Sequence, residues 1–167
     1  MPEHASATHR ATVDELIAQH KDLPGALMPL LHAVQDTIGH VPDEAVPQIA
    51  AALNLSRAEG HGVITFSHHF RREPAGRTVV QVCRAEACQS CGADALLAHA
   101  ERHLGCEAHH TSADGAFTLE PVYCLGLCAS SPAIRVDDRL HVRVTPERFD
   151  RILAAAAAAA SQGVEVA

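Results

Sequence analysis

Four of the six cysteines in this 167-residue chain fall into two close pairs. Cys83 and Cys88 are separated by four residues, and Cys124 and Cys128 are separated by three. Each pair follows a run rich in β-branched or aromatic residues, which is typical of a β-strand. Strands that end in paired thiols can bring four sulfur atoms to one edge of a sheet. Four thiolates at one place are a ligand set for a metal centre.

Three chemistries are open to these sulfur atoms. Four thiolates, two to each iron, are the usual ligands of a [2Fe-2S] cluster. A structural zinc site also uses pairs of cysteines separated by two to four residues, and it would make the protein an interaction module. Thiol–disulfide exchange is the third, because Cys88 and Cys91 form a C-x-x-C motif just before an expected helix. The spacing favours the cluster over zinc, and zinc over a thioredoxin-like thiol oxidoreductase.

A fourth pattern shares the same residues. Cys83, Cys88 and Cys91 match the first three ligands of plant-type ferredoxins, which have a fourth cysteine later in the chain. That pattern would leave either Cys124 or Cys128 without a role, and it gives no role to the N-terminal third of the chain.

The other cysteine and the histidines show no ligand spacing. We expect Cys106 to be a buried small hydrophobic residue. The thirteen histidines contain no His-Glu-x-x-His pattern, and the pairs His68–His69 and His109–His110 are typical of a surface. We therefore expect no histidine to bind a metal.

The composition of the chain argues against nucleic acid and a membrane as partners. The formal net charge of −7 argues against nucleic acid, because phosphate binding needs clustered Lys and Arg. No apolar run approaches the roughly 20 residues needed to cross a bilayer, and no signal peptide is present. We expect a cytoplasmic protein without membrane insertion. In the reducing cytoplasm, cysteines more often act as metal ligands or redox groups than form disulfides.

The order of expected elements divides the chain into two parts. Residues 1–72 are expected to form an N-terminal helical bundle, after a frayed polar start at residues 1–10. Capping boxes at Thr12–Glu15 and Ser56–Glu59 predict the starts of the first and fourth helices, and Pro42–Asp43 predicts the start of the third. The four expected helices run over residues 12–20, 27–38, 42–53 and 56–64.

Residues 73–167 are expected to form an α/β domain. The pattern predicts a strand, a helix, a second strand, a hairpin and a last helix that begins at Thr145–Pro146. We expect one helix on each side of the sheet. The expected ranges are 77–82, about 90–104, 117–123, 133–136 with 140–144, and 145 onward.

The cysteine motif resembles that of a known family. Cys83-x4-Cys88 followed by Cys124-Leu-Gly-Leu-Cys128 is similar to the thioredoxin-like [2Fe-2S] ferredoxin subunit of NADH:quinone oxidoreductase, NAD-reducing hydrogenases and NAD-dependent molybdenum formate dehydrogenases. The likeness covers roughly residues 25–153 and includes segments 27–42, 49–56, 62–66, 114–120 and 131–133.

This resemblance implies a fold, a cofactor and a role. The fold would be α+β, with the helical bundle followed by a thioredoxin-like α/β domain. One [2Fe-2S] cluster would be bound by Cys83, Cys88, Cys124 and Cys128, with no catalytic residue in this chain. The protein would be a non-catalytic electron-transfer subunit of an NAD-dependent oxidoreductase.

Two loops resemble one branch of the family. The segments Cys83–Gly92 and Phe70–Arg77 look most like the gamma subunit of NAD-dependent molybdenum formate dehydrogenase. That branch implies two partners, a flavin- and NAD-binding subunit and a molybdenum/iron–sulfur catalytic subunit. The alternative is the equivalent subunit of NADH:quinone oxidoreductase or of an NAD-reducing hydrogenase.

Overall fold

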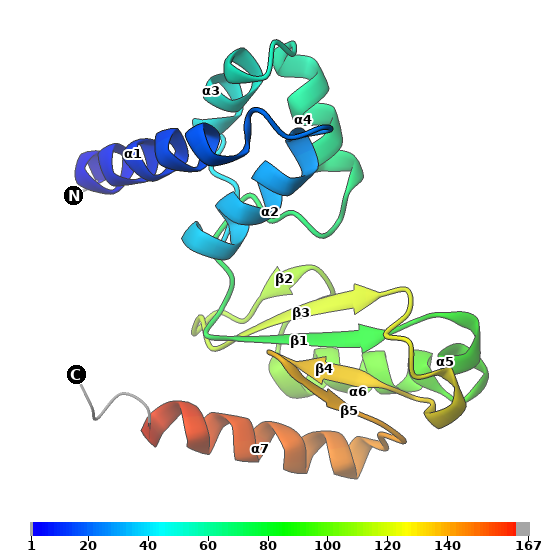
Figure 1. The fold of residues 1–167 in the computed structure, drawn as a ribbon. Coiled ribbons are helices and arrows are strands. Elements are labelled where there is room, and N and C mark those ends of the chain that lie inside the picture. The colour runs from blue at the N-terminus through cyan, green and yellow to red at the C-terminus, as the bar shows by residue number, and fades with distance from the viewer. Residues whose placement is uncertain (1, 163–167) are drawn as a thin grey trace. The chain divides into compact units, whose positions relative to one another are not determined.

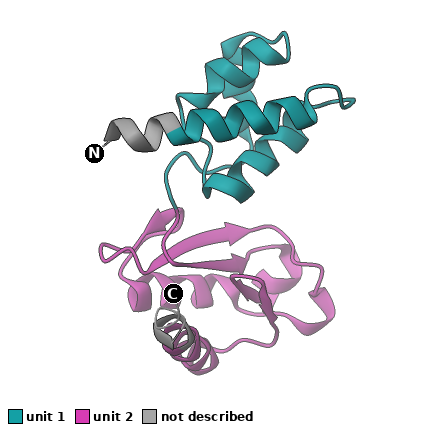
Figure 2. Cartoon of the chain, turned by 60° about the vertical axis from the view of Figure 1, so that its left-hand side comes forward, with its two compact units in different colours: residues 1–74 teal, residues 75–167 magenta. Residues whose placement is uncertain are grey.

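The computed structural model describes the backbone of residues 2–162 and the side chains of residues 8–158. The chain divides into two compact units, Met1–Pro74 and Ala75–Ala167, which Figure 2 shows in different colours. None of the helices in the described part combines the length and the apolar character that a membrane crossing requires.

The first unit consists of four helices around one apolar core (Figure 1). The helices are α1 (Pro2–His20), α2 (Leu27–Ile38), α3 (Ala45–Ala52) and α4 (Arg57–Phe66). Apolar residues at helical spacing place the buried face of each helix toward the same core. The core includes Val13, Leu30, Leu31, Val34, Val41, Val46, Ile49 and Ile64.

Local signals set two of the helix ends. The Ser56 hydroxyl accepts a hydrogen bond from the Glu59 N–H at 3.2 Å, and the Glu59 carboxylate accepts one from the Ser56 N–H at 2.8 Å. This is the expected capping box, and it is confirmed. Gly39 ends α2 with a φ of 90°, and its N–H donates to the Gln35 carbonyl at 2.7 Å. A residue with a side chain would be strained in that conformation.

The expected capping box at Thr12–Glu15 is wrong. Helix α1 begins at Pro2, so Thr12 lies inside it, and its hydroxyl donates to the Thr8 carbonyl at 3.1 Å. No glycine or proline interrupts residues 3–20, so nothing stops the helix from extending through the segment that was expected to be frayed. Helix α3 also begins slightly later than expected, at Ala45.

The second unit contains one five-stranded sheet with the order β2-β3-β1-β4-β5. Strand β1 pairs in parallel with β3 and antiparallel with β4, while β2 and β5 form the two edges. The expected hairpin is confirmed as β4 and β5. The strands are β1 (Thr78–Cys83), β2 (His110–Thr111), β3 (Phe117–Val122), β4 (Ile134–Val136) and β5 (Arg139–His141).

Helices α6 (Ala93–Leu104) and α7 (Pro146–Gln162) cover the same face of this sheet, so the expectation of one helix on each side is wrong (Figure 1). The strand sequences explain why. One face carries buried apolar side chains, whereas the alternating positions on the other face are largely polar. Only an apolar face can bury helices. The apolar side chains on the helix-bearing face are Val80, Val82, Leu119, Ile134 and Val136, and the polar ones on the other face are Gln81, Thr118, Glu120 and Arg135.

The helix expected from about residue 90 to Leu104 is confirmed as α6, and a short helix that was not expected precedes it. Helix α5 (Glu86–Ser90) ends at Cys91, and Gly92 with a φ of 91° separates it from α6. That left-handed conformation breaks the helical path, and glycine adopts it without strain. The two-residue strand β2 was not expected, because so short a segment has no recognisable alternation.

Candidate metal centre at the cysteine loops

The parallel pairing of β1 and β3 places the carboxyl ends of both strands side by side, and so brings both cysteine segments to the same end of the sheet. Cys83, the last residue of β1, lies opposite Val122, the last residue of β3. The chain therefore leaves both strands at the same end of the sheet, where α5 and the loop after β3 lie (Figure 1). The sequence predicted this arrangement from the strand-like runs before each pair.

The first pair is buried. Cys83 and Cys88 are each 2% exposed. The Cys83 N–H donates to the Ala133 carbonyl at 3.1 Å, which fixes the end of β1 against the start of the hairpin. Cys88 lies in α5, whose first turn closes with a hydrogen bond from the Cys88 N–H to the Ala85 carbonyl at 2.9 Å.

The second pair is exposed to solvent. The sulfur atoms of Cys124 and Cys128 lie 3.9 Å apart. Gly126 turns the loop between them with a φ of 75°, and its N–H donates to the Cys124 Sγ at 3.3 Å. A backbone N–H directed at sulfur stabilises negative charge on that atom.

Contacts between α5 and the second loop join the two pairs. Cys88 Sγ lies 3.4 Å from the Ser131 hydroxyl, which itself donates to the Cys128 carbonyl at 3.0 Å. Cys83 and Cys88 share one apolar cluster with Ala93 and Ala133. The partly buried Ala85, Val122, Leu125 and Leu127 pack against that cluster. All four cysteines therefore converge on one site.

The crowding of thiols changes their acidity. Burial raises the pKa of Cys83, and contact with the Cys88 thiol adds to the rise. Contact with the Cys124 thiol raises the pKa of Cys128. For Cys88, burial acts in the upward direction, but hydrogen bonds with Ser131, Ala133 and Cys83 together outweigh it and lower the pKa. Adjacent thiolates repel one another, so a bound cation is needed before all four are ionised together. The donor set thus fits an iron–sulfur cluster, as it also fits zinc.

Cys91 and Cys106 lie outside this site. Cys91 is exposed at the end of α5, whereas its C-x-x-C partner Cys88 is buried in the thiol cluster. Cys106 is partly buried against the core between the sheet and its helices, where burial raises its pKa. Neither thiol belongs to the apolar cluster of Cys83 and Cys88.

A third segment, residues 131–133, also lies at the site, and the spacing of the cysteines did not identify it. Ser131 and Ala133 contact the first cysteine pair, but neither residue type indicates a binding site by itself. The likeness of segment 131–133 to the family was the one signal that pointed to them.

Comparisons with known proteins agree with this geometry. The model of the thioredoxin-like [2Fe-2S] ferredoxin family matches residues 13–157. The chain is 36% identical over 146 residues to an E-type subunit of the NADH-quinone oxidoreductase of Rhizobium meliloti (strain 1021), covering 87% of each chain. It is 35% identical over 150 residues to the E-type subunit of the NADH-quinone oxidoreductase of Pseudomonas aeruginosa, covering 90% of each.

A solved structure shares the fold. The structure of an NAD+-reducing [NiFe]-hydrogenase in the air-oxidized state superimposes with a TM-score of 0.62 at 21% identity. The match covers 75% of this chain and 22% of the hydrogenase chain. It supports the expected α+β, thioredoxin-like architecture.

Proposed function

The chain belongs to the thioredoxin-like [2Fe-2S] ferredoxin family, and we propose that it is the electron-transfer subunit of an NAD-linked oxidoreductase complex. The [2Fe-2S] cluster expected from the sequence is the cofactor of this family. We assign its ligands to Cys83, Cys88, Cys124 and Cys128. The observation that carries this assignment is the convergence of two thiol pairs, from the ends of parallel strands, on one site.

The residues around the site suit a carrier of single electrons. The cluster, when bound, supplies a one-electron redox centre. The buried pair Cys83 and Cys88 would anchor it in the domain, and the Gly126 N–H would offset negative charge at sulfur. The exposed pair Cys124 and Cys128 would keep it close to the surface, where a partner can approach.

The partner that we propose is a flavin- and NAD-binding subunit. Tyr123, beside Cys124, is 68% exposed, and an exposed aromatic side chain at such a place is typical of a protein contact. Leu125 and Leu127, in the same loop, are only partly buried and pack against the cluster that contains Cys83 and Cys88. We also propose a cytoplasmic location, which is supported by six cysteines that form no disulfide.

The relatives favour one parent complex. The two NADH-quinone oxidoreductase subunits from Rhizobium meliloti and Pseudomonas aeruginosa align with this chain over most of their length. We therefore propose NADH:quinone oxidoreductase, or a related complex of the NAD-reducing hydrogenase type, ahead of formate dehydrogenase. This order reverses the expectation from the two loops, which favoured formate dehydrogenase.

Formate dehydrogenase remains the second candidate because of two loops. The segments Cys83–Gly92 and Phe70–Arg77 resemble its gamma subunit. Under this alternative, the complex would also contain a molybdenum/iron–sulfur catalytic subunit.

The test uses the complex purified anaerobically from its host through a tag on this chain. We expect a flavin subunit to copurify, and we expect NADH to reduce the [2Fe-2S] centre within the complex. The isolated chain should stay oxidised with NADH, because the flavin that accepts the hydride belongs to the proposed partner. Reduction by formate would identify a formate dehydrogenase, whereas NADH-dependent quinone reduction without a response to formate would identify the respiratory type. Absence of a flavin partner would refute the proposal.

A further inference from the structure

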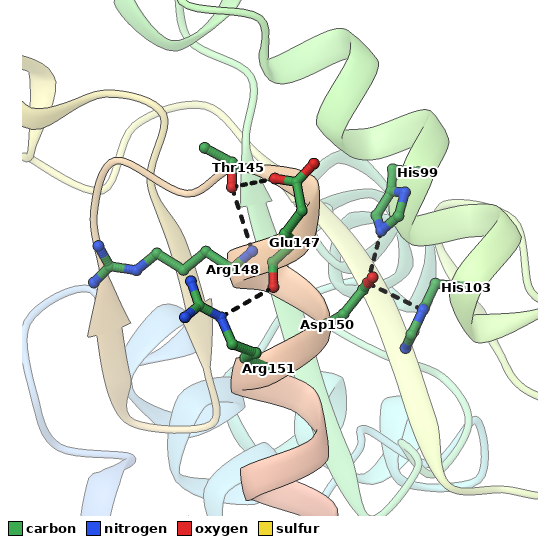
Figure 3. A network of polar contacts seen from close by, with 7 residues as sticks. All are labelled: His99, His103, Thr145, Glu147, Arg148, Asp150 and Arg151. Atoms are coloured by element: carbon green, nitrogen blue, oxygen red, sulfur yellow. Dashed lines mark hydrogen bonds and ion pairs between the residues drawn. The ribbon is translucent and has the colours of Figure 1, made fainter.

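Two histidines and an aspartate meet on the side of the second unit formed by α6 and α7. His99 Nε2 lies 2.7 Å from Asp150 Oδ1, and His103 Nδ1 lies 3.1 Å from the same oxygen. Figure 3 shows both rings directed at this carboxylate. The three ligand atoms all lie within 4.8 Å of one another.

The helices explain the convergence. His99 and His103 are four residues apart on α6, so their side chains lie one above the other on the same face. Helix α7 brings Asp150 to that face. The side chain of Phe149 is fully buried beneath them, and both imidazole rings meet it edge to face, with centroids 5.8 and 5.9 Å away. Because Phe149 restrains both rings, little freedom remains to be lost when a ligand binds.

We propose that His99, His103 and Asp150 form a binding site for a divalent transition-metal ion of the zinc type. Two imidazole nitrogens and one carboxylate oxygen are a common set of three protein ligands for zinc, with water in the fourth position. In a tetrahedral site with metal–ligand distances of about 2.0–2.2 Å, ligand atoms lie roughly 3.3–3.6 Å apart. The present separations of 2.7 and 3.1 Å approach this spacing, so small side-chain rotations open the site.

The exposure of the site allows an ion to enter. The side chains of His99, His103 and Asp150 are 23%, 40% and 42% exposed. Among the other residues drawn in Figure 3, Glu147 accepts a hydrogen bond from the Thr145 hydroxyl and Arg151 donates to the Glu147 carbonyl, and neither bond involves the Asp150 carboxylate. No arginine therefore occupies the Asp150 oxygen that both histidines share, as far as the described residues show.

The site departs from our expectation that no histidine binds a metal. The spacing of His99 and His103 is visible in the sequence, but Asp150 lies 47 residues beyond His103 and is brought to them only by the fold. A bound ion would tie α6 to α7. At an ion concentration about 100 times the Kd, the ratio of folded to unfolded protein would rise about 100-fold.

The experiment titrates the cluster-loaded full chain with zinc chloride in a calorimeter. We expect one zinc ion per chain beyond the iron of the cluster. His103→Ala and Asp150→Asn should each weaken binding more than tenfold. The matched control is His61→Ala, which removes an exposed helical histidine with Thr65, not histidine, four residues along. This control should leave the affinity unchanged.

X-ray absorption spectroscopy at the zinc edge identifies the ligand atoms independently of any mutation. We expect only nitrogen and oxygen neighbours at about 2.0–2.2 Å. Sulfur neighbours at about 2.3 Å would place zinc on cysteine and overturn the proposal. So would unchanged binding in the Asp150→Asn chain, or the absence of binding, which would leave the three residues as ion pairs only.

Discussion

Cys88 and Cys91 are only three residues apart, yet of the two only Cys88 lies in contact with another cysteine of the proposed ligand set. Cys88 is 2% exposed and contacts the other thiols, whereas Cys91 is exposed at a helix end. Spacing alone could not separate a C-x-x-C redox pair from a ligand beside a bystander, because burial depends on Ser131 and Ala133, more than 40 residues away.

This difference predicts distinct outcomes for three serine variants. Cys83→Ser and Cys128→Ser should lose or degrade the cluster, because each removes a thiolate ligand. Cys91→Ser should retain about two irons and two sulfides per chain. The measurement is iron and sulfide content after anaerobic purification. A Cys91→Ser protein without a cluster would mean that the ligand set is wrong.

His40 gives a prediction about pH. Burial, together with the charge of His9, lowers the pKa of His40 below 6.5. Between that lowered value and 6.5, the unfolded chain binds more protons than the folded chain. The contribution of His40 to stability is therefore complete above pH 6.5 and falls as the pH is lowered through that range. Between about pH 7.5 and 5.5, His40→Gln should lose less thermal stability than the parent. An identical loss in both proteins would contradict this account.

At the scale of elements, sequence patterns gave the type of most helices and strands and failed at particular boundaries. The Ser56–Glu59 box begins a helix because Asn54 and Leu55 precede it in a loop, whereas the same pattern at Thr12–Glu15 lies inside a longer helix. The side of the sheet that binds helices was readable from the strand alternation, yet it was missed. The lengths and first residues of the helices depended on the segments that flank each pattern, which the pattern itself does not include.

Alanine substitutions at two glycines test how closely the backbone is packed around each of them. A side chain at Gly76 would lie 2.8 Å from the backbone of Phe117, so Gly76→Ala should cost about 1–3 kcal/mol of unfolding free energy. Gly62, in α4, has no atom within 4 Å of an added carbon. Gly62→Ala should therefore raise stability by about 0.5–1 kcal/mol. Urea unfolding measures both, and equal effects of the two substitutions would contradict this packing.

At the scale of the whole molecule, the two units have separate apolar cores. Leu30 lies in the core of the first unit and Leu119 in that of the second, and both are fully buried. The cysteine site belongs to the second unit alone. A substitution that destabilises the core of the second unit should therefore promote loss of the cluster more than one that destabilises the core of the first.

Leu30→Ala and Leu119→Ala make a matched pair for this idea. Each should destabilise its own unit by about 2–5 kcal/mol, because each leaves a cavity. Visible absorbance of the cluster, followed during urea unfolding, should be lost at much lower urea in Leu119→Ala than in Leu30→Ala. Equal shifts in the two variants would show that the units unfold together.

The central claim, one [2Fe-2S] cluster on four cysteines, is tested most directly by iron and sulfide analysis with an EPR spectrum of the dithionite-reduced chain, purified anaerobically. The account predicts about two irons and two sulfides per chain and an S = 1/2 signal at low temperature. Stoichiometric zinc on the cysteines, with no cluster after anaerobic reconstitution, would contradict it and favour a structural module. Free thiols with disulfide reductase activity and no metal would contradict it in favour of thiol exchange.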